Sequence, residues 1–151
     1  MLKLKIPPPV YALVIGFFMW LLNQHYPIAH FITSPWNKIG IVMIVLAVSL
    51  DLSSLYLFFK KHTTPSPFSP KKSTTLVTSG LYKYTRNPMY VGLLIILTGY
   101  GVWLGSVAPF LLLPVFYWLI TIMQIKPEES ILEEKFGQDY LEYKNKVRRW
   151  L

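Results

Sequence analysis

The chain has 151 residues and a formal net charge of +8, yet 53% of its residues are hydrophobic and only 15% are charged. This composition excludes a disordered chain and leaves too little polar surface for a water-soluble globule. The sequence contains no cysteine, which excludes a disulfide framework, a cysteine-liganded metal and thiol catalysis. A positive charge on so apolar a chain favours a membrane protein held against an anionic leaflet over a nucleic-acid-binding protein.

Four apolar runs follow one another along the chain, and each is a candidate membrane span. They predict transmembrane helices over about residues 6–22, 39–59, 89–104 and 107–125. A helix rises about 1.5 Å per residue and the apolar core of a bilayer is roughly 30 Å thick, so the second and fourth runs fit best. The first run also resembles a signal peptide, but residues 23–26 offer no small-residue cleavage site. We therefore expect it to be retained.

Basic residues predict the orientation of these spans. Of the fifteen lysines and arginines, Lys38 alone lies in the connection between the first and second runs. The others lie before the first run, between the second and third, or after the fourth. Because basic segments stay in the cytoplasm, both termini and the site are expected to face it, in the inner (cytoplasmic) membrane. Residues 60–88, with a Pro- and Ser-rich stretch at 63–70, are expected to form an interfacial loop.

The segment after the fourth run has a helical pattern. Pro127 is typical of a helix start, and apolar residues then recur about every 3.6 residues up to Val147. This predicts an amphipathic helix over 127–147, along the membrane or over the bundle. The basic residues at and just after its end, Lys144, Lys146, Arg148 and Arg149, are expected to contact anionic headgroups. The predicted fold is a single all-α integral membrane domain over 1–151, with four transmembrane helices and this C-terminal amphipathic helix.

A short connection predicts where the polar groups gather. Only Gly105 and Ser106 separate the third and fourth runs, so these are expected to be adjacent and antiparallel. Their far ends should then meet at the cytoplasmic interface to within about one helical turn. One of these tips carries Arg86, Asn87, Pro88 and Tyr90, and the other carries Glu128 and Glu129.

The two tips together fit a zwitterion. The first offers hydrogen-bond donors for an anionic group, and the two carboxylates can bind an ammonium or sulfonium. Each residue also has a structural explanation: Arg86 as a positive-inside residue, the glutamates as acids of a first helical turn, and Tyr90 as an interfacial anchor. Their convergence favours a binding site.

Three further features lie within the runs or beside them. Asp51 is either a substrate or proton site, or a neutral carboxyl bonded to Ser54 or to the backbone. Gly92 and Gly99 favour close helix packing, and Gly99 could also let a cofactor approach the backbone. The three histidines of the sequence do not form a plausible metal site.

The segment from Leu76 to Gly92, which contains Arg-Asn-Pro-Met-Tyr-Val-Gly from Arg86, is followed by the Glu pair and by a Phe-Gly-x-x-Tyr-x-x-Tyr pattern at 136–143. Together they resemble the isoprenylcysteine carboxyl methyltransferase family, whose core is shared by phospholipid N-methyltransferases. The resemblance implies an integral membrane enzyme that uses S-adenosylmethionine. It implies that the cofactor is contacted by Asn87, Pro88, Tyr90, Gly92, Glu128 and Glu129. Arg86 would bind the methionine carboxylate or orient the substrate, which makes Arg86 and Glu129 the candidate catalytic residues.

The methyl acceptor stays open at this stage. The carboxyl methyltransferases typically have His where this chain has Asn87, whereas Asn-Pro-Met-Tyr is similar to the phospholipid enzymes. Candidates are an isoprenylcysteine-type carboxylate, a phospholipid amine or another small apolar molecule. The expected partners are this lipophilic substrate and membrane lipids, without nucleic acid, and the glycine faces permit a homodimer. The competing class is a noncatalytic four-span transporter subunit or assembly factor in which Asp51 would be the working residue.

Overall fold

The computed structural model describes residues 6–60 and 75–151. The Pro- and Ser-rich stretch of the expected interfacial loop lies outside these described residues. The described chain is helical, with no strand beyond two isolated bridges. Its α-helices are α1 (Pro8–His25), α2 (Ile39–Lys60), α3 (Pro88–Leu104), α4 (Leu112–Ile120), α5 (Lys126–Phe136) and α6 (Gln138–Lys146). Its other helical segments are η1 (Trp36–Lys38), η3 (Gly80–Lys83), η4 (Ala108–Leu111) and the π-helical η5 (Thr121–Ile125).

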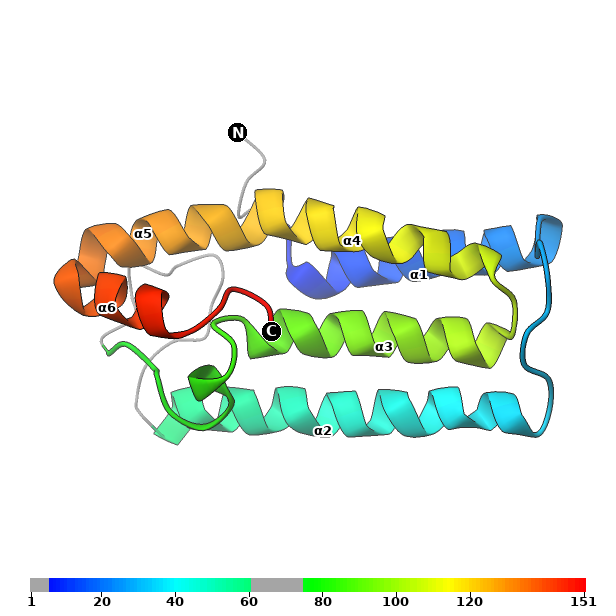
Figure 1. Cartoon of the computed structure of the whole chain (residues 1–151), viewed down its shortest axis with the longest axis horizontal. Helices are drawn as coiled ribbons and strands as arrows, with labels where there is room; N and C mark the ends of the chain where they lie inside the picture. Colours follow the sequence, from blue (N-terminus) through cyan, green and yellow to red (C-terminus); the bar gives the residue numbers. More distant parts are fainter. Residues whose placement is uncertain (1–5, 61–74) are drawn as a thin grey trace.

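The hairpin between the third and fourth apolar runs is present. Pro88 lies in the first turn of α3, where its missing N–H leaves no backbone partner unpaired. Gly105 ends α3 with φ 85°, a left-handed conformation that glycine adopts without strain, and its N–H donates to the Gly101 carbonyl. The chain then turns into η4, and α4 runs back alongside α3 (Figure 1).

The C-terminal part of the chain differs from the expected single helix over 127–147. Residues 108–136 form one continuous helix, so Pro127 lies inside it and does not start it. The π turn just before Pro127 lets the Lys126 N–H reach the Thr121 carbonyl, which accommodates a residue that has no N–H of its own. Gly137, with φ 51°, then separates α5 from α6, which folds back beneath α5 (Figure 1). The amphipathic pattern is thus divided between two helices.

Helix α2 packs against α3 through small residues. A Cβ on Gly99 of α3 would lie 2.7 Å from the Gly40 carbonyl oxygen of α2, so glycine permits this close approach. The buried core lies elsewhere, where α1, α3 and α4 meet around Met19, Leu97 and Phe116. On its remaining surface α2 exposes apolar side chains, with Val45 and Leu46 about 60% exposed. This arrangement leaves α2 with an apolar outer face.

Two helices of the described chain are long and apolar enough to cross a membrane. They cover Trp36–Leu57 and Ala108–Phe136, and Pro88–Leu104 is a shorter apolar helix. These helices lie side by side along the long axis of the molecule (Figure 1). The start of α3 and the turn of the α4–α5 helix that carries Glu128 and Glu129, called the two tips below, therefore lie toward the same end of the bundle, and α5 continues beyond them to Phe136.

Candidate functional site

Glu129 lies at the centre of a buried charge cluster. The residue is 7% exposed, and its carboxylate contacts two arginines from distant parts of the chain. Arg86, just before α3, places Nη2 3.1 Å from Oε1. Arg149, in the C-terminal tail, donates from Nε to Oε1 at 3.0 Å and from Nη2 to Oε2 at 2.7 Å. Such two-pronged contacts are among the strongest side-chain hydrogen bonds. Arg86, Glu129 and Arg149 are called the arginine clamp below.

The C-terminal tail is held against the start of α3 by further hydrogen bonds. The Arg86 N–H donates to the Arg148 carbonyl at 2.9 Å. The side-chain amide of Asn87 and the hydroxyl of Thr85 donate to the Arg149 carbonyl at 2.9 and 3.2 Å. The tail therefore covers the first turn of α3 and presents Arg149 to the clamp, whereas the sequence pattern had predicted a headgroup contact for that arginine.

Electrostatics favour the charged form of Arg149 and keep the tyrosine beside the clamp neutral. Hydrogen bonding to Glu129 raises the pKa of the Arg149 guanidinium above its usual value. Arg86 donates from Nη1 to the hydroxyl of Tyr140 at 3.5 Å. Burial, with a smaller contribution from Glu129, raises the pKa of Tyr140 to about 12, so this phenol stays protonated at physiological pH.

Glu128, the neighbour of Glu129 in the sequence, has a different environment. The Tyr90 hydroxyl donates to Glu128 Oε1 at 2.7 Å. Within the part of the chain that the structure describes, no lysine or arginine forms an ion pair with Glu128. Consecutive helical residues point about 100° apart, which is why only one glutamate of the pair enters the clamp.

Two carboxyl groups, those of Glu128 and Asp51, act electrostatically on the buried phenol of Tyr82. Burial raises the pKa of Tyr82 above its usual range, and the negative charges of Glu128 and Asp51 add to the effect. The Tyr82 carbonyl accepts a hydrogen bond from the Tyr143 hydroxyl at 2.7 Å, which anchors η3 to α6. Asp51, Tyr82, Tyr90 and Glu128 are called the acidic side of the site below.

Asp51 lacks the hydrogen bond that the sequence suggested. Its Oδ1 atom is completely buried and has no hydrogen-bond partner among the described residues. The Ser54 hydroxyl donates instead to the Leu50 carbonyl at 3.0 Å. The Asp51 carboxyl lies against Gly92 of α3, in space that a Cβ at Gly92 would occupy. A carboxylate with an unpaired buried oxygen is costly unless a ligand or a proton satisfies it.

The structure brings most of the candidate residues together and separates two of them. Arg86, Asn87, Pro88, Tyr90, Glu128 and Glu129 lie at the two adjacent tips. Gly92 and Gly99 instead face α2 with the side that lacks a Cβ. Gly99 also lies twelve residues from Asn87, about 18 Å along the helix. Both glycines therefore serve close helix packing in this structure, and their contact with a cofactor stays a prediction.

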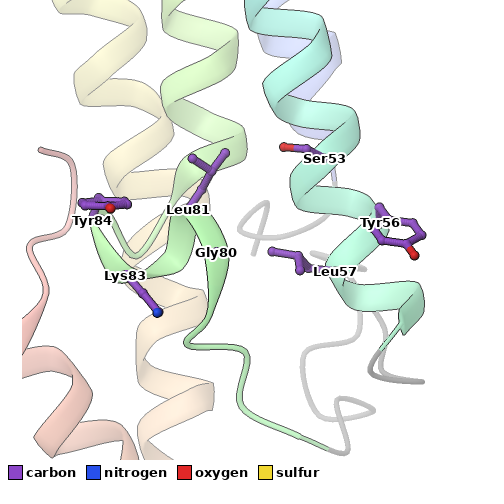
Figure 2. Close-up of a pocket in the computed structure, with 7 residues that line it drawn as sticks. All are labelled: Ser53, Tyr56, Leu57, Gly80, Leu81, Lys83 and Tyr84. Carbon is purple, nitrogen blue, oxygen red and sulfur yellow. The ribbon is translucent and has the colours of Figure 1, made fainter.

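An open groove of about 470 Å³ lies beside the site, between the end of α2 and η3 (Figure 2). Gly80 approaches α2 so closely that a Cβ would lie 2.5 Å from a Leu57 methyl, and its φ of 63° also favours glycine. The groove is lined by Ser53, Tyr56, Leu57, Gly80, Leu81, Lys83 and Tyr84. None of the site residues expected from the sequence is in this lining.

The similarity to known proteins covers the part of the chain that carries the two tips. A family model described as phospholipid methyltransferase matches residues 36–139, which include both tips and exclude Arg149. An uncharacterized protein of Haemophilus influenzae is 48% identical over 42% of this chain and 100% of its own length. A protein-S-isoprenylcysteine O-methyltransferase of Schizosaccharomyces pombe is 38% identical over 50% of this chain and 32% of its own.

A second enzyme of the same kind extends the similarity. The protein-S-isoprenylcysteine O-methyltransferase B of Arabidopsis thaliana is 30% identical over 83% of this chain and 60% of its own length. The similarity thus spans about a third of the yeast enzyme and less than two thirds of the plant enzyme. No solved structure matches the chain significantly.

Proposed function

Because the chain belongs to the family of phospholipid and isoprenylcysteine methyltransferases, we propose that it is a membrane-embedded enzyme that moves a methyl group from S-adenosylmethionine to a lipophilic acceptor. The observation that carries the proposal is the contact between the two tips inside the matched segment. Arg86 pairs with Glu129 at 3.1 Å, and Tyr90 bonds Glu128 at 2.7 Å. Cationic and anionic groups thus converge at the end of one helical hairpin.

The groups at this place fit a zwitterionic methyl donor. Arg86 is 8% exposed in its side chain, and its buried Nε has no partner among the described residues, so a donor remains for a carboxylate. Glu128 accepts a hydrogen bond from a phenol and forms no ion pair with any described residue, so it can face an ammonium or sulfonium. When bound, S-adenosylmethionine supplies a sulfonium methyl group that is already activated for nucleophilic attack.

Each residue of the tips has a distinct role in this proposal. Glu129 holds Arg86 in place, and Arg86 with Asn87 binds or orients the anionic end of the ligand. Pro88 starts α3 at a defined residue, and the Tyr90 and Val91 amides donate to the Asn87 carbonyl, which fixes the position of Tyr90. Tyr90 orients Glu128 toward the cationic end. Methyl transfer from a sulfonium depends mainly on positioning, so a rigid hydrogen-bonded site suits the reaction.

The membrane arrangement is part of the same proposal. Helices α1, α2 and α3 and the continuous α4–α5 helix would each cross the bilayer, with both termini and the site on the cytoplasmic side. A lipophilic acceptor would then reach the site from the bilayer while the polar methyl donor enters from the cytoplasm. The low dielectric at this depth strengthens every charge contact at the tips.

The proposal is tested with the purified chain in detergent or nanodiscs. Methyl-labelled S-adenosylmethionine is added with a total lipid extract, and we expect label in a chloroform-soluble product. Glu129→Gln and Tyr90→Phe should abolish or strongly reduce both this transfer and binding of the labelled donor. Glu134→Gln, an exposed acid on the same helix, should behave like the parent. Label that stays in water, with no donor bound by the parent, would instead support the noncatalytic membrane protein.

A further inference from the structure

We propose that Asp51 determines the acceptor specificity of this enzyme: its carboxylate holds the protonated amine of a lipid and disfavours acceptors that carry a carboxylate. The inference rests on the proposed function, since it names the class of acceptor for the same site. It concerns a residue on α2, outside the two tips on which the motif similarity depends.

The Asp51 carboxyl group is short of hydrogen-bond donors. Oδ1 is buried without a hydrogen-bond partner, and the nearby Ser54 hydroxyl is already used by the Leu50 carbonyl. Glycine at position 92 leaves the space that the carboxyl occupies against α3. Oδ1 itself is covered, but Asp51 is only partly buried as a residue, and in this proposal the ligand approaches the carboxyl group from its exposed side. An ammonium would supply the hydrogen-bond donors that this carboxylate lacks.

The charges on the acidic side also favour a cationic ligand. Asp51 and Glu128 both act on Tyr82, and no ion pair joins either carboxylate to a cation in the described ranges. Arg149 and Nη2 of Arg86 already contact Glu129, and the remaining Nε of Arg86 is assigned to the carboxylate of the methyl donor. A second carboxylate brought here would meet two like charges at low dielectric, whereas an ammonium would meet two opposite ones.

The carboxylate would also prepare the amine for reaction. A protonated amine has no lone pair available to attack a methyl group. Transfer of one proton to Asp51 breaks an N–H bond, leaves the electron pair on nitrogen and forms an O–H bond on the carboxyl group. The acceptor becomes a neutral amine and Asp51 a neutral acid, so total charge is conserved in this step.

Binding in the absence of the methyl donor provides a test independent of turnover. The full chain in detergent is titrated with dioleoyl phosphatidylethanolamine and with N-acetyl-S-farnesylcysteine, and bound lipid is measured by native mass spectrometry. We expect the parent to bind the amine lipid at least tenfold more tightly. Asp51→Asn should lower that affinity at least tenfold while leaving S-adenosylmethionine binding unchanged. Asp139→Asn, the same change at an exposed position, should alter neither.

The chemistry of the product gives a second test that uses the parent alone. Labelled methyl esters release volatile methanol in alkali, whereas N-methyl groups do not, so we expect alkali-stable label. Preference of the parent for the farnesyl carboxylate, alkali-labile label, or full amine binding by Asp51→Asn would each overturn the inference. Transfer to the carboxylate lipid would do so while upholding the methyltransferase function. If the parent binds no methyl donor, the proposed function fails, and lipid binding still decides the role of Asp51.

Discussion

The arginine clamp and the acidic side differ in how their carboxylates are satisfied. Glu129 accepts hydrogen bonds from Arg149 on both of its oxygens and forms an ion pair with Arg86 through Oε1. Glu128, one residue earlier, receives one phenolic hydrogen bond, and Asp51 has a buried oxygen with none in the described chain. A carboxylate saturated within the protein fixes the architecture, whereas one left short of donors is available to a ligand. The comparison separates positioning groups from binding groups.

Glu129→Gln should have the largest effect on the difference in stability between the clamp and the acidic side. Removing this charge leaves Arg86 and Arg149 together without their shared anion, in a site where both Arg86 and Glu129 are less than 10% exposed in their side chains. Loss of one partner of a buried ion pair costs about 3–5 kcal/mol. We expect this loss in the unfolding free energy in detergent. Glu128→Gln, which keeps an oxygen for the Tyr90 hydroxyl, should cost far less, and equal costs would contradict the distinction.

Tyr90→Phe tests the acidic side directly. The variant removes the only hydrogen bond that Glu128 receives from a described side chain. Leaving a buried polar group unsatisfied costs about 1–3 kcal/mol. Binding of the labelled methyl donor should fall more than stability does, because Glu128 is a ligand group in the proposed site. A matched Tyr84→Phe change, at an exposed residue, is the control.

Arg149→Lys tests whether the two-pronged geometry of Arg149, and not only its charge, stabilises the clamp. Lysine keeps the charge but cannot reproduce the two parallel hydrogen bonds that Arg149 makes at 3.0 and 2.7 Å. Since the arginine side chain is 34% exposed, we expect a loss of only about 1 kcal/mol in unfolding free energy. Arg148→Lys, whose side chain is exposed, should be neutral by the same measurement.

The phenol of Tyr140 makes the stability of the fold depend on pH in the alkaline range. Its pKa is raised to about 12 in the folded chain, above its usual value of about 10, so the folded state holds the phenolic proton more tightly than the unfolded state. The resulting stabilisation is complete below pH 10 and is lost as pH rises toward 12. Difference titration of phenolate absorbance between the parent and Tyr140→Phe should show this late step. A step near pH 10 would contradict it.

An exposed ion pair gives the smallest expected effect. Lys144 donates to Glu133 at 2.9 Å, but their side chains are 36% and 42% exposed. Surface pairs contribute about 0–1 kcal/mol, so Lys144→Gln should change the unfolding free energy by only a few tenths of a kcal/mol. A loss as large as that of Glu129→Gln would show that burial does not govern these pairs.

The amino-acid sequence determined the apolar helices and the meeting of two polar tips. Hydropathy defines the runs because apolar side chains must leave water, and a connection as short as Gly105 and Ser106 permits only an antiparallel neighbour. The contact of Arg86 with Glu129 follows from that connection. The family similarity follows from the order and spacing of the same motifs.

The partners of the buried charged groups depend on the tertiary structure. From the sequence, Arg149 is one of several basic residues expected to contact lipid headgroups. Its hydrogen bonds to Glu129 depend on how α5, α6 and the tail fold back over α3. The unpaired oxygen of Asp51 likewise depends on the approach of α2 to Gly92 and on the Ser54 hydroxyl bonding its own helix. Local sequence patterns predict helices because their causes are short-ranged. The partners of a buried charge lie far along the chain, so packing alone selects them.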